Sequence, residues 1–225
     1  MATDLLQSLH KKLVVSCQAP VDSPLHHPDM IAAIAQAAVK RGAAGVRIDT
    51  PDHVRAVRQR VDVPIIGLWK QVFEGCDVYI TPQVHHAEAI AQAGADIIAI
   101  DATVRPRPDG ETVEQMIDAI HQLGKLVMAD VDTLEAAIAA EKAGADLVGT
   151  TLYGYTADTQ HQKPPSFDLV TQMAQQLQVP VVCEGGISSP EMARHALEAG
   201  AYTVVVGTAI TGIDIQVSAY SAALQ

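Results

Sequence analysis

Two residues with proton-transfer chemistry stand directly after short apolar runs of the chain. Lys70 follows the run 65–69, and Glu184 follows the run 179–183. Burial lowers the pKa of a lysine from about 10.4, so a buried Lys70 could act as a base near neutral pH. Glu184 could exchange a proton with a substrate oxygen or orient the lysine. The alternatives are that Lys70 is a surface residue and that Glu184 only neutralises Arg47.

Further charged residues follow apolar runs in the same way. Asp130 would either hold Lys70 in its charged form or cap the next helix. Asp101 and Arg105 are interpreted either as substrate-facing residues or as residues that cap a loop. The sequence alone leaves both pairs of alternatives open.

The histidine and cysteine positions do not predict a metal site. The histidine pairs at 26–27 and 85–86 are adjacent residues, which face different ways on a helix or strand, and no HxxxH or Cys/His cluster accompanies them. Cys17, Cys76 and Cys183 are widely spaced and form no CxxC pair. We therefore predict no bound metal and three reduced thiols in a cytoplasmic protein.

The charge of the chain excludes two classes of partner. Its formal net charge is −11 at pH 7, whereas nucleic acids and anionic membranes are bound through clustered Lys and Arg. No window reaches the roughly 18 consecutive apolar residues of a membrane span, and residues 1–12 contain no apolar stretch of signal-peptide length. An anionic small molecule would therefore be held by backbone N–H groups and a few cations.

A repeated pattern indicates which elements position these side chains. A glycine and a small residue precede a short apolar run in the segments 41–48, 93–100, 143–149 and 199–206. Glycine adopts positive φ where a helix ends, so each copy predicts a helix-to-strand junction. Further apolar runs lie between the copies, at 13–16, 63–68, 125–129 and 179–183. Together these runs predict eight strands.

Amphipathic stretches fill the gaps between the predicted strands. They carry Ala and Leu at helical spacing and cover 28–41, 51–61, 112–123, 133–143, 167–177 and 190–199. With 48% hydrophobic and only 4% aromatic residues, this order predicts one domain over 1–225, a closed (β/α)8 TIM barrel. An open doubly wound sheet is the alternative. The polar segment 154–166 is long enough to form a lid or an active-site loop.

Glycines after the last two predicted strands indicate where an anion would bind. Gly185 and Gly186 follow the seventh strand, and Gly207 and Thr208 follow the eighth. TIM barrels often bind phosphate at these places, because glycine lets the backbone approach and successive N–H groups receive the anion. Either pair alone is a weak signal, but together they predict a barrel of the phosphate-binding type.

The strand ends resemble one known family over nearly the whole chain. The matching segments contain the candidate residues and are 14–19, 45–47, 66–70, 79–82, 101–103 with 107–108, 128–130, 149–152 with 154–156, 183–185 and 206–211. In this order they resemble the N-acylglucosamine-6-phosphate 2-epimerase family, also called N-acetylmannosamine-6-phosphate epimerases. Trp69, Gln71, Tyr153 and Gly186 depart from the family pattern and concern substrate detail more than the reaction.

The resemblance implies an isomerase of carbohydrate metabolism. Such an enzyme converts N-acetylmannosamine 6-phosphate to N-acetylglucosamine 6-phosphate, a step in the use of sialic acid and amino sugars, without a cofactor or metal. The resemblance implies catalytic roles for Lys70 and Glu184. It places Gln18, Arg47 and Asp130 where residues contact the substrate or support the lysine. It also suggests a homodimer.

The expected mechanism is deprotonation and reprotonation at C2. The sugar ring must open first, because the C2 proton becomes acidic only beside a carbonyl group. Lys70 would be the base, Glu184 would move protons at ring opening or reprotonation, and Arg47 with Gln18 would hold the N-acyl group or the oxyanion. Two alternatives remain: a lyase in which Lys70 forms a Schiff base, and a non-catalytic barrel that binds a phosphorylated sugar.

Overall fold

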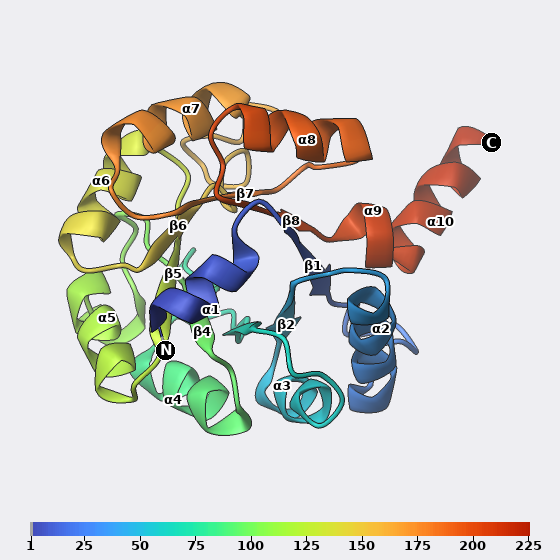
Figure 1. Ribbon diagram of the computed structural model, residues 1–225, viewed down its shortest axis with the longest axis horizontal. Helices are drawn as coiled ribbons and strands as arrows, with labels where there is room; N and C mark the ends of the chain where they lie inside the picture. Colours follow the sequence, from blue (N-terminus) through green and yellow to red (C-terminus); the bar gives the residue numbers. More distant parts are fainter. Residues whose placement is uncertain (1) are drawn as a thin grey trace.

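The computed structural model describes residues 2–225 and contains a closed barrel of eight parallel strands (Figure 1). The strands follow one another around the barrel in chain order, and the eighth closes it by pairing with the first. They are β1 (Leu13–Cys17), β2 (Gly45–Asp49), β3 (Ile65–Leu68), β4 (Ile97–Asp101), β5 (Leu126–Asp130), β6 (Leu147–Gly149), β7 (Val181–Glu184) and β8 (Thr203–Val206). The predicted TIM barrel is confirmed, and the open sheet is excluded.

Helices surround the barrel (Figure 1). Those that follow strands β1 to β7 are α2 (Pro28–Lys40), α3 (Pro51–Arg58), α4 (Val84–Ala93), α5 (Val113–Gln122), α6 (Leu134–Lys142), α7 (Phe167–Gln176) and α8 (Pro190–Glu198). The others are α1 (Ala2–Leu9) before the barrel, the 3₁₀ helix η1 (Pro108–Gly110) before α5, and α9 (Thr208–Thr211) and α10 (Ile213–Ala223) after β8. All six helices named from the sequence are present within a few residues of their predicted bounds.

Two predicted strands begin later than the apolar runs suggested. β3 starts at Ile65 and β7 at Val181, whereas the runs start at 63 and 179. Pro64 and Pro180 lie in between, and a proline has no N–H to donate to a neighbouring strand. The ladder therefore begins after each proline.

The core has two layers, because each parallel strand buries both of its faces. Side chains such as Val14 and Ile66 form an apolar cluster inside the barrel. Ile48 and Ile98 belong to a second cluster that lies between the barrel and the helices. Leu9 of α1 is fully buried in the inner cluster, so α1 closes the end at which the strands begin (Figure 1).

The four repeated glycines have the conformation that the sequence predicts. Gly42, Gly94, Gly144 and Gly200 have φ angles of +105°, +107°, +103° and +106°. L-residues with a side chain rarely adopt this conformation. Each glycine therefore ends a helix and lets the chain turn into the next strand, as expected.

Helix α10 does not pack onto the barrel as the other long helices do. It has no buried residue and points away from the ring of helices (Figure 1). Its exposed apolar side chains include Ile213, Ile215, Val217 and Tyr220. Neither α10 nor any other helix within residues 2–225 is long and apolar enough to cross a membrane.

Candidate active site

The C-terminal ends of the strands surround a cavity of about 890 Å³. Active sites of (β/α)8 barrels lie at this end, because the connections that follow the strands meet there. The candidate residues in its wall are Gln18, Arg47, Lys70, Glu184, Gly185, Gly186, Gly207 and Thr208. The candidates Asp130, Asp101 and Arg105 do not line the cavity. The structure thus brings together residues that are far apart in the sequence.

Arg47 is the centre of a buried cluster of charges. Its Nη2 lies 2.6 Å from Asp130 Oδ2, and its Nη1 donates to Asp130 Oδ1 at 3.1 Å and to Glu184 Oε2 at 2.8 Å. The planar guanidinium can bind two carboxylates at once. Burial alone would lower the pKa of Arg47, but the two carboxylates outweigh it and raise that pKa above its ordinary value. Arg47 therefore stays charged.

Within residues 2–225, the Nε atom of Arg47 is unpaired in the wall of the cavity. It is buried and has no hydrogen-bond partner in the described part of the chain. The same holds for side-chain nitrogens of Arg58, His86 and Arg107, but only Arg47 lines the cavity. Because buried polar groups are nearly always paired, a bound molecule with an acceptor atom would complete the hydrogen bonding of Arg47.

Glu184 combines an ion pair with a place in the cavity wall. Burial raises its pKa from 4.5 to about 7; Arg47 and Lys70 partly oppose this rise, and Asp130 adds to it. A carboxyl group that titrates near neutral pH can both give and take a proton. Pairing with Arg47, the alternative role inferred from the sequence, is present, and Glu184 also faces the cavity.

Lys70 lines the cavity and is exposed, so the structure combines a place in the cavity wall with the surface position that the sequence left open. The residue stands two positions beyond the end of β3, where the barrel opens toward solvent. Its Nζ donates to Gln18 Oε1 at 2.5 Å, and Gln18 Nε2 donates to Ser16 Oγ at 3.0 Å. The side chain of Gln18 thus holds the amine in the cavity wall.

Asp49 supports the main chain at Lys70, and the sequence reasoning did not single it out. Its Oδ1 accepts a hydrogen bond from the backbone N–H of Lys70 at 3.0 Å, and it lines the cavity. Burial raises the pKa of Asp49, while Lys70 opposes that rise. The available signal was its spacing of two residues from Arg47, which puts both side chains on one face of a strand.

Asp130 contacts Arg47 rather than Lys70. It is fully buried beneath the cavity, at the end of β5. The expected support of Lys70 is not among its contacts, and Thr133 rather than Asp130 caps α6. Its place in the structure is therefore that of a partner which holds Arg47.

The segment around Asp101 has the loop-capping role. Asp101 is fully buried, accepts a hydrogen bond from the backbone N–H of Thr103 at 3.0 Å and pairs with Arg105 at 2.6 Å. Neither Asp101 nor Arg105 lines the cavity. Of the two alternatives for these residues, the structure supports the cap of the loop.

The glycines after β7 and β8 present backbone donors to the cavity. Gly185 and Gly186 have positive φ angles of +100° and +72°. The N–H groups of Gly185, Gly186, Gly207 and Thr208 have no hydrogen-bond partner among residues 2–225. N–H groups gathered on one wall of a cavity can receive an anion without adding net positive charge.

The segment 154–166 lies against these glycines. A Cβ atom on Gly186 would come within 2.4 Å of the backbone oxygen of Pro164, so the close approach depends on glycine at this position. Tyr155, which belongs to the same segment, lines the cavity and is 56% exposed. The segment therefore contributes to the active site.

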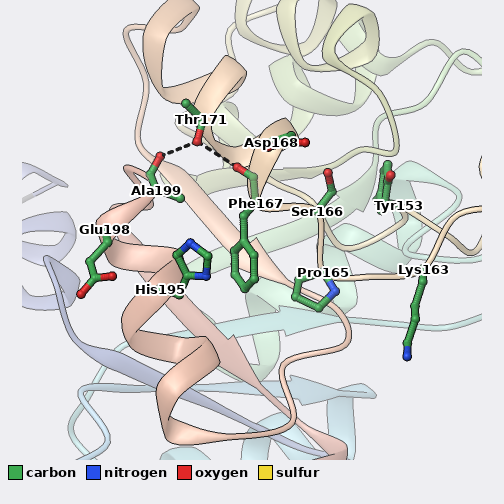
Figure 2. Close-up of a pocket in the computed structure, with 10 residues that line it drawn as sticks. All are labelled: Tyr153, Lys163, Pro165, Ser166, Phe167, Asp168, Thr171, His195, Glu198 and Ala199. Atoms are coloured by element: carbon green, nitrogen blue, oxygen red, sulfur yellow. Dashed lines mark hydrogen bonds between the residues drawn. The ribbon is translucent and has the colours of Figure 1, made fainter.

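A second cavity, of about 520 Å³, lies outside the barrel mouth between α7 and α8 (Figure 2). The rings of Phe167 and His195 are 4.2 Å apart there, and Thr171 Oγ1 lies 2.9 Å from the backbone oxygen of Phe167. None of the candidate residues lines this cavity. The candidate proton-transfer residues Lys70 and Glu184 line the cavity at the barrel mouth and not this one.

The cysteines and histidines form no metal-binding group in the part of the chain that the structure describes. His26 lines the cavity, and its Nδ1 lies 3.0 Å from the backbone oxygen of Ala19. Cys17 and Cys183 are free thiols, and burial raises the pKa of each to about 12. They therefore remain protonated and unreactive in the core.

Comparison with known proteins identifies the family. A model of the family described as "Putative N-acetylmannosamine-6-phosphate epimerase" matches residues 31–225. A protein of Synechococcus elongatus named "Putative N-acetylmannosamine-6-phosphate 2-epimerase" is 65% identical over 222 residues, which cover 97% of this chain and 96% of the relative. A protein of the same name from Thermosynechococcus vestitus is 58% identical and covers 99% of this chain and 97% of its own.

Solved structures agree with this assignment. The N-acetylmannosamine-6-phosphate 2-epimerase from Clostridium perfringens has a TM-score of 0.93 and 38% identity, with 98% of this chain and 96% of that chain covered. Thiamine phosphate pyrophosphorylase from Pyrococcus furiosus, at 20% identity and a TM-score of 0.64, shares the fold alone. The chain therefore belongs to the N-acetylmannosamine-6-phosphate epimerase family.

Proposed function

We propose that this protein is an isomerase that converts N-acetylmannosamine 6-phosphate to N-acetylglucosamine 6-phosphate by inverting C2. The observation that carries the proposal is one cavity, in a chain of this family, that contains an amine, a carboxyl group with a pKa of about 7 and four free backbone N–H groups. The first two groups supply proton transfer. The N–H groups supply a place for a phosphate.

The reaction requires an open sugar chain. In the closed ring the C2 proton is hardly acidic, whereas in the open form it is α to the C1 aldehyde. Glu184 has the pKa needed to protonate the ring oxygen as the ring C1–O bond breaks, and its Oε2 is already held by Arg47. The C1 hydroxyl loses its proton to water and becomes the aldehyde. The deprotonated carboxylate can later take back the proton that it gave to the ring oxygen.

Lys70 is proposed as the base at C2. Gln18 holds its amine in the cavity wall, and bound sugar would cover the open side of Lys70 and exclude water from it. The amine of Lys70 removes the C2 proton, and the enolate that results carries its charge at the former aldehyde oxygen. The return of a proton to the opposite face of C2 gives the inverted product.

Arg47 is proposed to stabilise the enolate. Asp130 fixes its guanidinium through two hydrogen bonds, and the buried Nε has no partner within residues 2–225. A donor oriented in advance stabilises a developing charge without reorganising during the reaction. In this view Asp130 acts on the substrate through Arg47, and Gln18 contributes its amide to the N-acyl group.

The phosphate is proposed to bind at Gly185, Gly186, Gly207 and Thr208. The free N–H groups of these residues line the cavity on the side formed by β7 and β8. This is the usual phosphate site of such barrels. It sets the sugar carbons toward Lys70 and Glu184.

Turnover in D₂O tests the reaction and its base. Purified protein should interconvert the two 6-phosphates and incorporate deuterium at C2. Lys70→Ala and the matched variant Lys70→Arg, which keeps the charge but not the basicity, should each lose at least about 10³-fold in kcat. The fold should persist, because Lys70 is exposed. An active folded Lys70→Ala variant would contradict the assignment of the base, and C–C cleavage products would favour a lyase.

A homodimer in the cytoplasm completes the proposal. Helix α10 leaves apolar side chains such as Val217 and Tyr220 exposed, and a second copy of the chain could cover them. The three free cysteines fit a reducing compartment. Light scattering should give the mass of two chains, and the mass of one chain would contradict the dimer.

A further inference from the structure

Two consecutive threonines after β6 contact Glu184 from different sides. Thr150 Oγ1 donates to the backbone oxygen of Glu184 at 2.9 Å and accepts from its backbone N–H at 3.2 Å. Thr151 Oγ1 donates to Asp130 Oδ1 at 2.5 Å and lies 3.3 Å from Glu184 Oε2. One threonine therefore holds the main chain of Glu184, and the other contacts its carboxyl group.

The two oxygens of Glu184 have different surroundings. Oε2 accepts from Arg47 Nη1 at 2.8 Å and lies 3.3 Å from Thr151 Oγ1, whose single hydrogen it shares with the nearer Asp130 Oδ1. Oε1 has no hydrogen-bond partner among the described residues, and Glu184 lines the cavity. An oxygen that accepts a hydrogen bond from a guanidinium and shares the hydrogen of a hydroxyl is a poor place for a proton. The proton of the neutral carboxyl group therefore belongs on Oε1.

The absence of a side chain at Gly149 lets this arrangement form. A Cβ atom there would come within 2.5 Å of Met128 Cε and within 3.2 Å of Thr151 Oγ1. Gly149 precedes the two threonines and ends β6. The backbone thus leaves room for the Thr151 hydroxyl to lie between the two carboxylates.

We propose that Thr151 is a positioning residue for the acid of the reaction, which together with Arg47 occupies Glu184 Oε2 and leaves the exchangeable proton on Oε1. This inference rests on the proposed function. The proton passes from Oε1 to the ring oxygen of the substrate as the ring C1–O bond breaks, and the C1 hydroxyl loses its proton to water as it becomes the aldehyde. The carboxylate that remains is stabilised by hydrogen bonds to Oε2.

The charged groups around Glu184 indicate in which direction its pKa should change when the Thr151 hydroxyl is removed. Arg47 from β2 and Lys70 after β3 favour the carboxylate, and Asp130 from β5 disfavours it. The hydrogen bond from Thr151 also favours the carboxylate. Its removal should therefore raise the pKa of Glu184. The Asp130 carboxylate also loses the hydrogen bond from Thr151, so its negative charge is less compensated and raises the pKa of Glu184 further.

The variants Thr151→Val and Thr151→Ser separate the hydroxyl from the shape of the side chain. In ¹³C NMR of carboxyl-labelled glutamate, with Glu184→Gln to assign the signal, Thr151→Val should move the titration midpoint up by at least about half a pH unit. It should lower kcat about tenfold with KM changed less than about threefold. Thr151→Ser should restore both values.

A hydroxyl removed elsewhere provides the matched control. Thr171 lies in the second cavity, and Thr171→Val should leave both kcat and the titration of Glu184 as in the wild type (Figure 2). Thermal unfolding checks that each variant is folded.

The proposed function and the role of Thr151 can be contradicted separately. A wild type that does not epimerise would overturn the proposed function, whatever the titration shows. An active wild type with an unshifted titration in Thr151→Val would overturn only the role of Thr151. A rise in KM without a shifted titration would also overturn it, because Thr151 would then be contacting the substrate.

Discussion

Two buried aspartates at the ends of neighbouring strands look alike but have different partners. Asp101 of β4 and Asp130 of β5 face each other in the strand register, and both are fully buried. Each binds an arginine at 2.6 Å. Arg105 comes four residues after Asp101 in the same connection, whereas Arg47 comes from β2.

The two arginines differ in the other groups that they contact. Arg47 also binds Glu184, lines the cavity and retains an Nε atom without a partner within residues 2–225. Arg105 donates to Thr103 and to the backbone oxygen of Asp77, and it does not line the cavity. A buried ion pair therefore does not mark an active site. The second carboxylate bound by Arg47 and the position of Arg47 in the cavity wall distinguish the pair at the candidate active site.

Among the variants that test this comparison, Arg47→Lys should cause the largest loss of activity. Lysine keeps the charge but loses the fork that binds Asp130 through two nitrogens, and it loses the free Nε donor. We expect kcat/KM to fall roughly 10³-fold. Steady-state kinetics measures the loss, and circular dichroism checks the fold. Activity within tenfold of the wild type would show that charge alone suffices and would remove the distinction between the two pairs.

Asp130→Asn and Asp101→Asn form a matched pair with the next largest effect. Each breaks a buried ion pair, so each should lower the free energy of unfolding by about 3 kcal/mol. Only Asp130→Asn should lower kcat substantially, by about 10²-fold, because only Asp130 orients a residue of the cavity wall. Urea unfolding measures the loss of stability of both variants, and steady-state kinetics measures their loss of kcat. Equal losses of activity would contradict the comparison.

The sequence predicted the barrel well because local rules determine it. The helix-ending glycines at Gly42, Gly94, Gly144 and Gly200 mark four junctions, and each has the expected positive φ. Polar residues at strand ends meet in one cavity because parallel strands end on the same side of a barrel. The positions of Lys70 and Glu184 in the cavity wall followed from this topology alone.

The partners of these residues could not be predicted, because they depend on register and depth. Nothing in the spacing indicates that Asp130 lies under Arg47 rather than beside Lys70, since they come from three different strands. The exposure of Lys70 depends on how far it stands beyond β3. Helix α10 lies outside the βα repeat, so the count of strands gave no sign of it.

The pH dependence of the free energy of unfolding tests the raised pKa of Glu184, the second carboxylate that Arg47 binds. Its pKa of about 7 exceeds the value of about 4.3 of an unfolded chain, so the folded state binds this proton more tightly. The stabilisation is complete below about pH 4.3 and is lost as the pH rises through about 7, a change of about 4 kcal/mol. Glu184→Gln should remove this part of the slope.

Urea unfolding of wild type and Glu184→Gln between pH 4 and 8, roughly the window of the shift, measures this difference. Burial also raises the pKa of Asp101, which adds a slope of the same sign in both proteins. The difference between the two curves therefore isolates Glu184. Parallel curves would mean that Glu184 titrates alike in the folded and unfolded states.

Arg105→Lys should have the smallest effect and completes the comparison with Arg47→Lys. An ammonium group can still pair with Asp101, but the hydrogen bonds to Thr103 and to the backbone oxygen of Asp77 would be lost. We expect the free energy of unfolding to fall by about 1 kcal/mol. Because Arg105 does not line the cavity, kcat and KM should stay within about threefold of the wild type. A tenfold loss of kcat in a variant of unchanged stability would mean that Arg105 acts on the substrate. The substrate-facing alternative for Asp101 and Arg105 would then replace the loop cap, and both buried ion pairs would belong to the active site.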